Sequence, residues 1–162
     1  TNCGLKDNSS EAEIMKGLGA NLLKPLKLFN LISSTFVNKY ISGVFISSMY
    51  AHVVPKNSNY DNKEIINPLY YGVAKSGVEQ GIKWLSCQNS KHRFNSIVLG
   101  PMPKGNIQNE QKILMENLIK SLPTGKFVDH RDLHETINFL LMDKLLGLRG
   151  ASIFLDGGYT LW

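Results

Sequence analysis

Three short apolar segments alternate with longer segments of helical periodicity, and this alternation limits the chain to few folds. The apolar segments are residues 43–48, 94–99 and 151–155. Each is short enough to be a buried strand; the first begins with a glycine, and a glycine or an aspartate follows each of the other two. Strands that alternate with helices form a parallel sheet with right-handed crossovers. The sequence therefore predicts an α/β fold with about three parallel strands and flanking helices.

The longest helical segment runs from Ser9 to about Lys39. Ser9 and Ser10 precede two glutamates, which is typical of a helix start. Pro25 interrupts the apolar periodicity, so we expect a bend or a junction between two helices there. Further helices are expected from Pro68 to about Cys87, at about 108–121, and from about Arg131 to Asp143.

Composition places the chain among globular proteins. It has 162 residues, of which 43% are hydrophobic and 19% charged, which fits one domain spanning residues 1–162. No apolar run approaches the roughly 18 residues of a membrane span. Cys3 and Cys87 are too few for a disulfide framework, which favours a cytoplasmic location. The net charge of +5 is spread along the chain, and we expect neither a nucleic-acid nor a membrane partner.

Tyr71 and Lys75 are the strongest candidates for chemistry. Residues four apart share one face of a helix, roughly 5–6 Å apart at their Cβ atoms. A nearby ammonium group favours the phenolate form of a tyrosine. Such a tyrosine can exchange a proton with an alcohol or a carbonyl oxygen. Ser48, at the end of the first apolar segment, could bind the same oxygen.

These residues belong to a series of motifs that resembles the short-chain dehydrogenase/reductase family over nearly the whole chain. Ile46 to Ser48 resembles the strand that carries the family's catalytic serine, and Tyr71 with Lys75 resembles its catalytic pair. Asn21 matches the family's asparagine on the long helix that comes before this strand. The other matching motifs are Thr1–Gly4, Asn95–Gly100, His130–Leu133 and Ile153–Gly158.

The resemblance implies a Rossmann-like doubly wound sheet and an NAD(P)-dependent oxidoreductase that interconverts an alcohol and a carbonyl. Tyr71 would be the acid/base. Lys75 would favour its ionised form and bind the nicotinamide ribose, Ser48 would hold the substrate oxygen, and Asn21 would support a proton relay through water. The cofactor, NAD or NADP, would contact Asn2, Cys3, Gly4, Tyr71, Lys75, Gly100 and Met102. The resemblance also implies a homo-oligomer and a small-molecule substrate.

The sequence departs from the family pattern in several places. Leu99 stands where the family has proline, and Cys3 where it has alanine. The segment from Val54 to Asn67 is longer than usual, and its polar residues favour a polar substrate such as a sugar. The family's glycine-rich phosphate loop has no counterpart in this sequence, which therefore resembles the C-terminal two thirds of such an enzyme. On its own, this part is expected to be inactive.

Two other functions stay open on the sequence. The long segment before Tyr71, and Glu79 after it, also fit a sugar-nucleotide epimerase or dehydratase of the family's extended branch. A non-catalytic interaction module is the alternative of another class, because the strand at 43–48 would have an unpaired edge. His130 and His134 have the spacing of metal ligands, but a surface helix explains them better, and no metal is expected.

Overall fold

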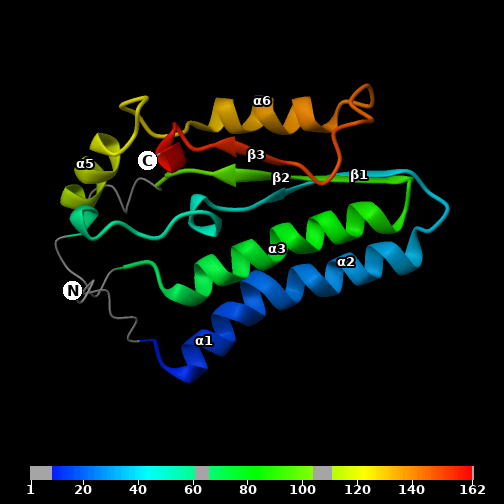
Figure 1. Ribbon diagram of the computed structural model, residues 1–162, viewed down its shortest axis with the longest axis horizontal. Helices are drawn as coiled ribbons and strands as arrows, with labels where there is room; N and C mark the ends of the chain where they lie inside the picture. The colour runs from blue at the N-terminus through cyan, green and yellow to red at the C-terminus, as the bar shows by residue number, and fades with distance from the viewer. Residues whose placement is uncertain (1–8, 61–65, 104–110, 162) are drawn as a thin grey trace.

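The computed structural model describes residues 9–60, 66–103 and 111–161 (Figure 1). Asn2, Cys3 and Gly4 lie outside these residues. Within the described ranges, none of the helices combines the length and the apolar character that crossing a membrane requires.

Three parallel strands form the sheet, in the order β1 (Ile41–Ile46), β2 (His92–Leu99) and β3 (Ser152–Leu155). Both pairings are parallel, with Ile41 opposite His92 and Ser96 opposite Ser152. The bounds of the three strands lie within two residues of the expected ones, and the predicted α/β class with a parallel sheet is confirmed. In the described sheet β1 is an edge strand.

Helices cover both faces of the sheet (Figure 1). One face carries the N-terminal helices and α3, and the other carries α6. Their bounds are α1 (Glu11–Leu18), α2 (Lys24–Thr35), α3 (Leu69–Gln88) and α6 (His130–Leu141).

The N-terminal helix starts and bends where the sequence indicates. The Ser10 side chain accepts a hydrogen bond from the Glu13 N–H, and the Glu13 carboxylate accepts one from the Ser10 N–H, which makes a capping box. The disturbance expected at Pro25 is a π-helical turn, η1 (Gly19–Leu23), just before it. Proline has no N–H to donate to the preceding turn, and the regular α-helical hydrogen bonding changes just before it.

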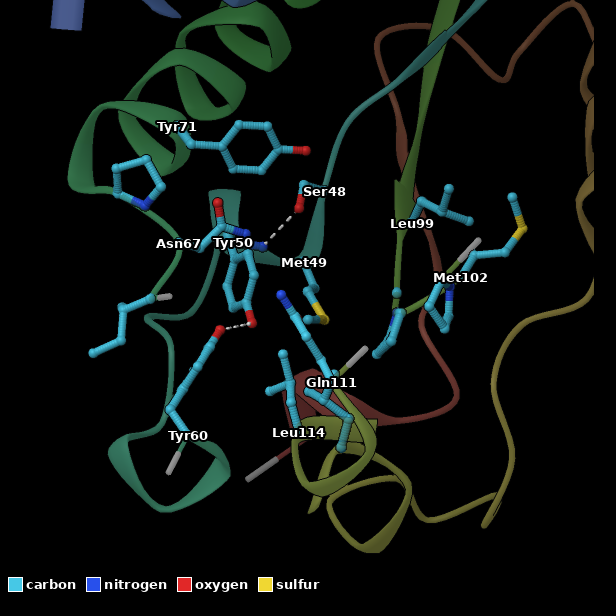
Figure 2. Close-up of a pocket in the computed structure, with 16 residues that line it drawn as sticks. Ser48, Met49, Tyr50, Tyr60, Asn67, Tyr71, Leu99, Met102, Gln111 and Leu114 are labelled. Carbon is cyan, nitrogen blue, oxygen red and sulfur yellow. Dashed lines mark hydrogen bonds between the residues drawn. The ribbon is translucent and has the colours of Figure 1, made fainter. Parts of the chain in front are cut away.

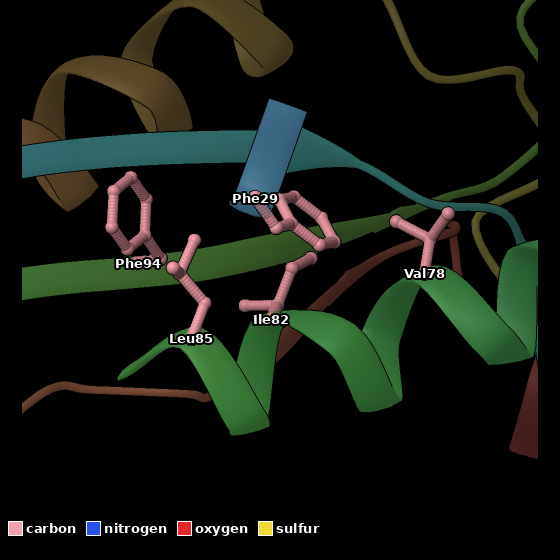
Figure 3. Packing of buried hydrophobic residues seen from close by; sticks show 5 residues of the cluster. All are labelled: Phe29, Val78, Ile82, Leu85 and Phe94. Atoms are coloured by element: carbon pink, nitrogen blue, oxygen red, sulfur yellow. The ribbon is translucent and has the colours of Figure 1, made fainter. Parts of the chain in front are cut away.

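Apolar side chains from α2, α3 and β2 form the core between the helices and the sheet. Figure 3 shows Phe29 of α2, three aliphatic residues of α3 and Phe94 of β2 in contact, all at most 3% exposed. The three α3 residues are Val78, Ile82 and Leu85. Their spacing places them on one face of α3, and this face fixes the helix against the sheet.

Arg93 fixes the opposite face. Neighbouring side chains of β2 point to opposite faces of the sheet. Phe94 faces α3, so the Arg93 side chain lies on the α6 side. Arg93 is fully buried there. Its guanidinium donates to carbonyl oxygens at the end of α6 and after it, and to two hydroxyl groups near β1. The acceptors are Leu140, Met142, Leu145, Tyr40 and Ser42.

The shorter elements gather beyond the carboxyl ends of the strands. They are η2 (Met49–Ala51), η3 (Asn57–Asn59), α5 (Lys112–Lys120) and η5 (Tyr159–Leu161). A second apolar cluster joins η2, α5 and η5 there, built on Met49, Met115, Leu118, Leu122 and Tyr159. The helix expected at 108–121 starts at Lys112, and residues 104–110 lie outside the described ranges. In open α/β sheets ligands bind at this edge.

Replacing Gly100 with alanine should destabilise the intact protein. A Cβ atom there would lie 2.5 Å from the Cα of Asp156, which is backbone and cannot move aside easily. We expect a loss of about 1–3 kcal/mol in the free energy of unfolding, measured in urea. Gly147→Ala is the control, because its Cβ would meet no atom within 4 Å. Equal stability of the two variants would contradict the close packing at Gly100.

Candidate functional site

A cavity of about 430 Å³ opens at the carboxyl ends of the strands. Its lining comes from the segment after β1, the start of α3, the segment after β2, and α5. Figure 2 shows Ser48 and Tyr71 on one side of it and Tyr60 and Leu114 on the other. Elements far apart in the sequence thus converge on one space.

Ser48 presents its hydroxyl group to this cavity. It is 7% exposed, has extended backbone (φ −150°, ψ 149°), and forms the N-cap of η2. The Ser48 Oγ accepts a hydrogen bond from the Tyr50 N–H at 3.2 Å. Since the oxygen is the acceptor in this bond, the hydroxyl proton can be donated to a ligand.

Tyr71 and Lys75 lie on consecutive turns of α3 beside Ser48. Tyr71 lines the cavity, and its ring extends from the helix with the hydroxyl group on the side of Ser48 (Figure 2). The Lys75 Nζ lies 5.7 Å from the centre of the Tyr71 ring. It donates a hydrogen bond to the Ile46 carbonyl at 3.0 Å. Burial lowers the pKa of the Lys75 ammonium below its usual value.

Asn21 lies in the π-helical turn and is not part of the cavity lining. Its side-chain amide donates to the Gly17 carbonyl at 3.0 Å. Among the described residues, Asn21 and Lys75 share no hydrogen bond. The predicted proton relay through water therefore stays a prediction.

The predicted cofactor residues divide into two groups. Gly100 and Met102 line the cavity beside Leu99, the residue that replaces the family's proline. Asn2, Cys3 and Gly4 lie outside the described residues, so their role is still an expectation. Asn95, from the motif that ends at Gly100, is fully buried. It holds the chain before β3 through the Leu148 carbonyl and the Ala151 N–H, which is a structural role.

The neighbours of the two catalytic candidates have other contacts. The ring of Tyr70 packs against Gly17 of α1, where a Cβ atom would lie 2.1 Å from it. The Ser47 hydroxyl donates to the buried Glu79 carboxylate. Unlike these two neighbours, Tyr71 and Ser48 line the cavity.

The long segment before α3 is anchored by Asn59, which is 2% exposed. The Asn59 amide donates to the Tyr159 hydroxyl at 3.1 Å and accepts from the Ser121 hydroxyl at 3.0 Å. Nearby, the Tyr50 and Tyr60 hydroxyls form a hydrogen bond of 3.1 Å (Figure 2). Burial raises the pKa of the Tyr50 phenol well above its usual value, so this group stays protonated.

The sequence alone misses Asn59 as an anchor and Tyr50, Tyr60 and Leu114 as cavity residues. The long segment is rich in asparagine, and nothing local distinguishes the buried one. Tyr50 directly follows the Ser48 region, and this proximity was the one signal that could have identified it. Leu114 comes from α5, whose approach depends on the tertiary fold.

The two histidines with metal-like spacing lie on α6. Asp129 caps this helix by accepting from the Asp132 N–H at 2.8 Å, and this hydrogen bond lowers the pKa of the Asp129 carboxyl. His134 lies within 3.6 Å of Glu135, and both side chains are about 70% exposed. Among the described residues no group of three side chains is arranged to hold a metal ion.

Comparison with known proteins identifies the family. A family model described as "Enoyl-(Acyl carrier protein) reductase" matches residues 8–160. The chain belongs to the short-chain dehydrogenase/reductase family. Members of this family are oxidoreductases, and the resemblance found in the motifs is thereby confirmed.

Individual relatives agree with the family. Post-translational flagellin modification protein A of Campylobacter coli is 29% identical over 140 residues, which cover 82% of this chain and 53% of that protein. The NADH-dependent L-xylulose reductase of Ambrosiozyma monospora is 27% identical over 157 residues, covering 91% of this chain and 54% of that protein. The chain spans about half the length of these curated relatives.

A solved structure shows the same fold. A short-chain dehydrogenase from Leptospira borgpetersenii with bound NAD⁺ matches with a TM-score of 0.79 and 21% identity. The match covers 94% of this chain and 58% of that one. The strands and helices of this chain thus have the arrangement of a short-chain dehydrogenase/reductase.

Replacing Asn59 with alanine should loosen the wall of the cavity. The change leaves the Ser121 hydroxyl and the buried Tyr159 hydroxyl without this amide. We expect a loss of about 1–3 kcal/mol in the free energy of unfolding. Ser58→Ala, at the exposed neighbouring position, should change it by less than about 0.5 kcal/mol. An equally small effect at Asn59 would show that the segment is held in another way.

Proposed function

We propose that the intact protein is an NAD(P)-dependent oxidoreductase that interconverts an alcohol and a carbonyl group at Ser48, Tyr71 and Lys75. The observation that carries the proposal is the shared cavity, which brings Ser48 from the end of β1 and Tyr71 from α3 to one side of a single space. Family membership supports the reaction type.

The residues of the site fit a nicotinamide cofactor. Among the described contacts, the Lys75 ammonium uses one of its three hydrogens, so two can bind the hydroxyl groups of a ribose. Gly100 offers backbone without a side chain beside the cavity. When bound, the cofactor donates or accepts the hydride. We infer NAD or NADP as the cofactor and leave the choice between them open.

In the proposed mechanism, the protein positions the substrate oxygen and moves its proton. The Ser48 hydroxyl donates a hydrogen bond to the oxygen, since its own oxygen already accepts from the Tyr50 N–H. Tyr71 gives the proton to this oxygen in reduction and takes it back in oxidation. Lys75, with its ammonium held near the Tyr71 ring, stabilises the phenolate that forms.

The side chains that line the cavity indicate which classes of substrate could bind there. Its described lining includes Met49, Leu99, Met102, Leu114 and Leu118, with polar groups mainly from Asn67, Gln111 and the hydroxyls. The apolar side chains favour a small carbonyl compound with an apolar body. The polar composition of the segment before α3 favours a sugar instead. The two classes are separated by assaying the intact protein with aliphatic ketones and with ketoses of equal length.

The exposed face of α2 and α3 supports a homo-oligomer. Leu31 of α2 is 58% exposed, and Val73 and Trp84 of α3 are 54% and 47% exposed. The two helices lie side by side on one face of the sheet (Figure 1). Exposed apolar side chains that lie together on one face are typical of a protein–protein contact. We infer that two copies of the intact protein pair through this face, as the family resemblance implies.

Tyr71→Phe should remove nearly all turnover in the intact protein while the cofactor still binds. The variant keeps the ring and removes only the group that exchanges the proton. We expect kcat to fall about 10²–10⁴-fold with the better substrate class, and NADH or NADPH still to bind, as measured by fluorescence titration. Tyr70→Phe is the matched control, since Tyr70 packs against α1. Retained turnover in Tyr71→Phe would contradict the proposed mechanism.

Leu31→Asp should convert the oligomer to monomers. The carboxylate would be buried in the proposed contact without a partner, which is strongly unfavourable. Sedimentation velocity of the intact protein measures the change. Ile113→Asp, at a 51% exposed apolar position on α5, is the control and should leave the oligomer intact. Unchanged sedimentation of Leu31→Asp would rule out this face as the contact.

A further inference from the structure

Glu79 is a buried carboxyl group that the proposed mechanism does not use. It lies on α3 one helical turn after Lys75, is 5% exposed, and is not part of the cavity lining. Burying an ionised carboxylate is costly unless hydrogen bonds replace its water. The partners of Glu79 therefore indicate which part of the molecule depends on it.

The serine partners lie just after β1 and on β3, and a further serine links them to β2. The Ser47 hydroxyl, just after β1, donates to Oε1 of Glu79, and the Ser152 hydroxyl of β3 donates to Oε2 at 2.7 Å. Ser152 in turn accepts from the Ser96 hydroxyl of β2 at 3.0 Å. The His52 Nε2 lies 3.0 Å from Oε2. A carboxylate only accepts hydrogen bonds, so Nε2 of His52 carries a hydrogen.

This network fixes the residue next to Ser48. The Ser47 N–H donates to the Ile97 carbonyl of β2 at 2.8 Å, and its side chain is held by Glu79. Lys75 holds the preceding carbonyl, that of Ile46. Ser48 itself has only the bond from the Tyr50 N–H among its described side-chain contacts. The direction of the Ser48 hydroxyl thus depends on the backbone at Ser47.

We propose that Glu79 is a positioning residue that orients Ser48 through the Ser47 hydroxyl. The inference rests on the proposed function, in which Ser48 holds the substrate oxygen. Lys75 and Glu79, on successive turns of α3, form hydrogen bonds with the Ile46 carbonyl and the Ser47 hydroxyl. Tyr71 extends from the same helix. The geometry between the serine and the tyrosine is therefore set by one rigid element. A displacement of about 1 Å in such a site can lower the rate 10²-fold.

Glu79→Gln in the intact protein tests the role, because it keeps the size and replaces an acceptor with an NH₂ group. We expect kcat to fall roughly 10- to 100-fold, with the Kd for NADH or NADPH unchanged. Ser47→Ala should have a similar effect, whereas Ser47→Thr keeps a hydroxyl and should keep most of the turnover. Gln80→Ala, at the exposed next position of α3, is the control. Full turnover in Glu79→Gln would overturn the proposal.

The double variant with Ser48→Ala separates positioning from a general structural role. If Glu79 acts through Ser48, Glu79→Gln lowers kcat in the wild-type background and has no further effect when Ser48 is absent. Effects that multiply in the double variant would show that Glu79 acts elsewhere, and would overturn the proposal.

Hydrogen exchange distinguishes failure of this inference from failure of the proposed function. If the intact wild-type protein turns over none of the ketones and ketoses, the proposed function is wrong. The positioning claim is then decided by amide exchange at residues 48–51. Faster exchange there in Glu79→Gln, with α3 and β2 unchanged, would support it. Unchanged exchange would overturn it.

Discussion

The site depends on the contact between one face of α3 and the segment that follows β1. The face consists of Gly72, Lys75, Ser76 and Glu79, whose spacing places them on successive turns. At Gly72 a Cβ atom would lie 2.6 Å from the Tyr50 carbonyl oxygen, so only glycine permits the approach. The Ser76 hydroxyl donates to the Ala51 carbonyl at 2.7 Å. Because Tyr71 leaves the same helix, this contact sets its position relative to Ser48.

The sequence predicts well what local spacing determines. Tyr71 and Lys75 are adjacent because four residues complete about one helical turn, and the helix itself follows from apolar periodicity. Ser47 and Ser48 have different environments because neighbouring side chains of an extended segment point in opposite directions. The parallel sheet follows from the alternation of strands and helices, and its three strands were placed correctly to within a few residues.

Sequence spacing does not reveal contacts between residues that only the tertiary fold brings together. The sequence connects Glu79 only with the extended branch of the family. Its carboxylate accepts hydrogen bonds from Ser47 after β1 and from Ser152 of β3, and their meeting requires the sheet register. Asn59 lies among other asparagines and becomes an anchor only because α5 and the C-terminal turn reach it. The side-chain amide of Asn21 donates to the Gly17 carbonyl of its own helix, a contact that apolar periodicity does not indicate.

Membership of the short-chain dehydrogenase/reductase family and the shared cavity together place the chemistry at Ser48 and Tyr71 in our proposal. The most direct measurement is a crystal structure of the intact protein with cofactor and a substrate or an alcohol inhibitor. Our account predicts one ligand oxygen within about 3.2 Å of both the Ser48 Oγ and the Tyr71 hydroxyl oxygen. A ligand oxygen that contacts neither hydroxyl, in a complex that turns over in the crystal, would contradict it.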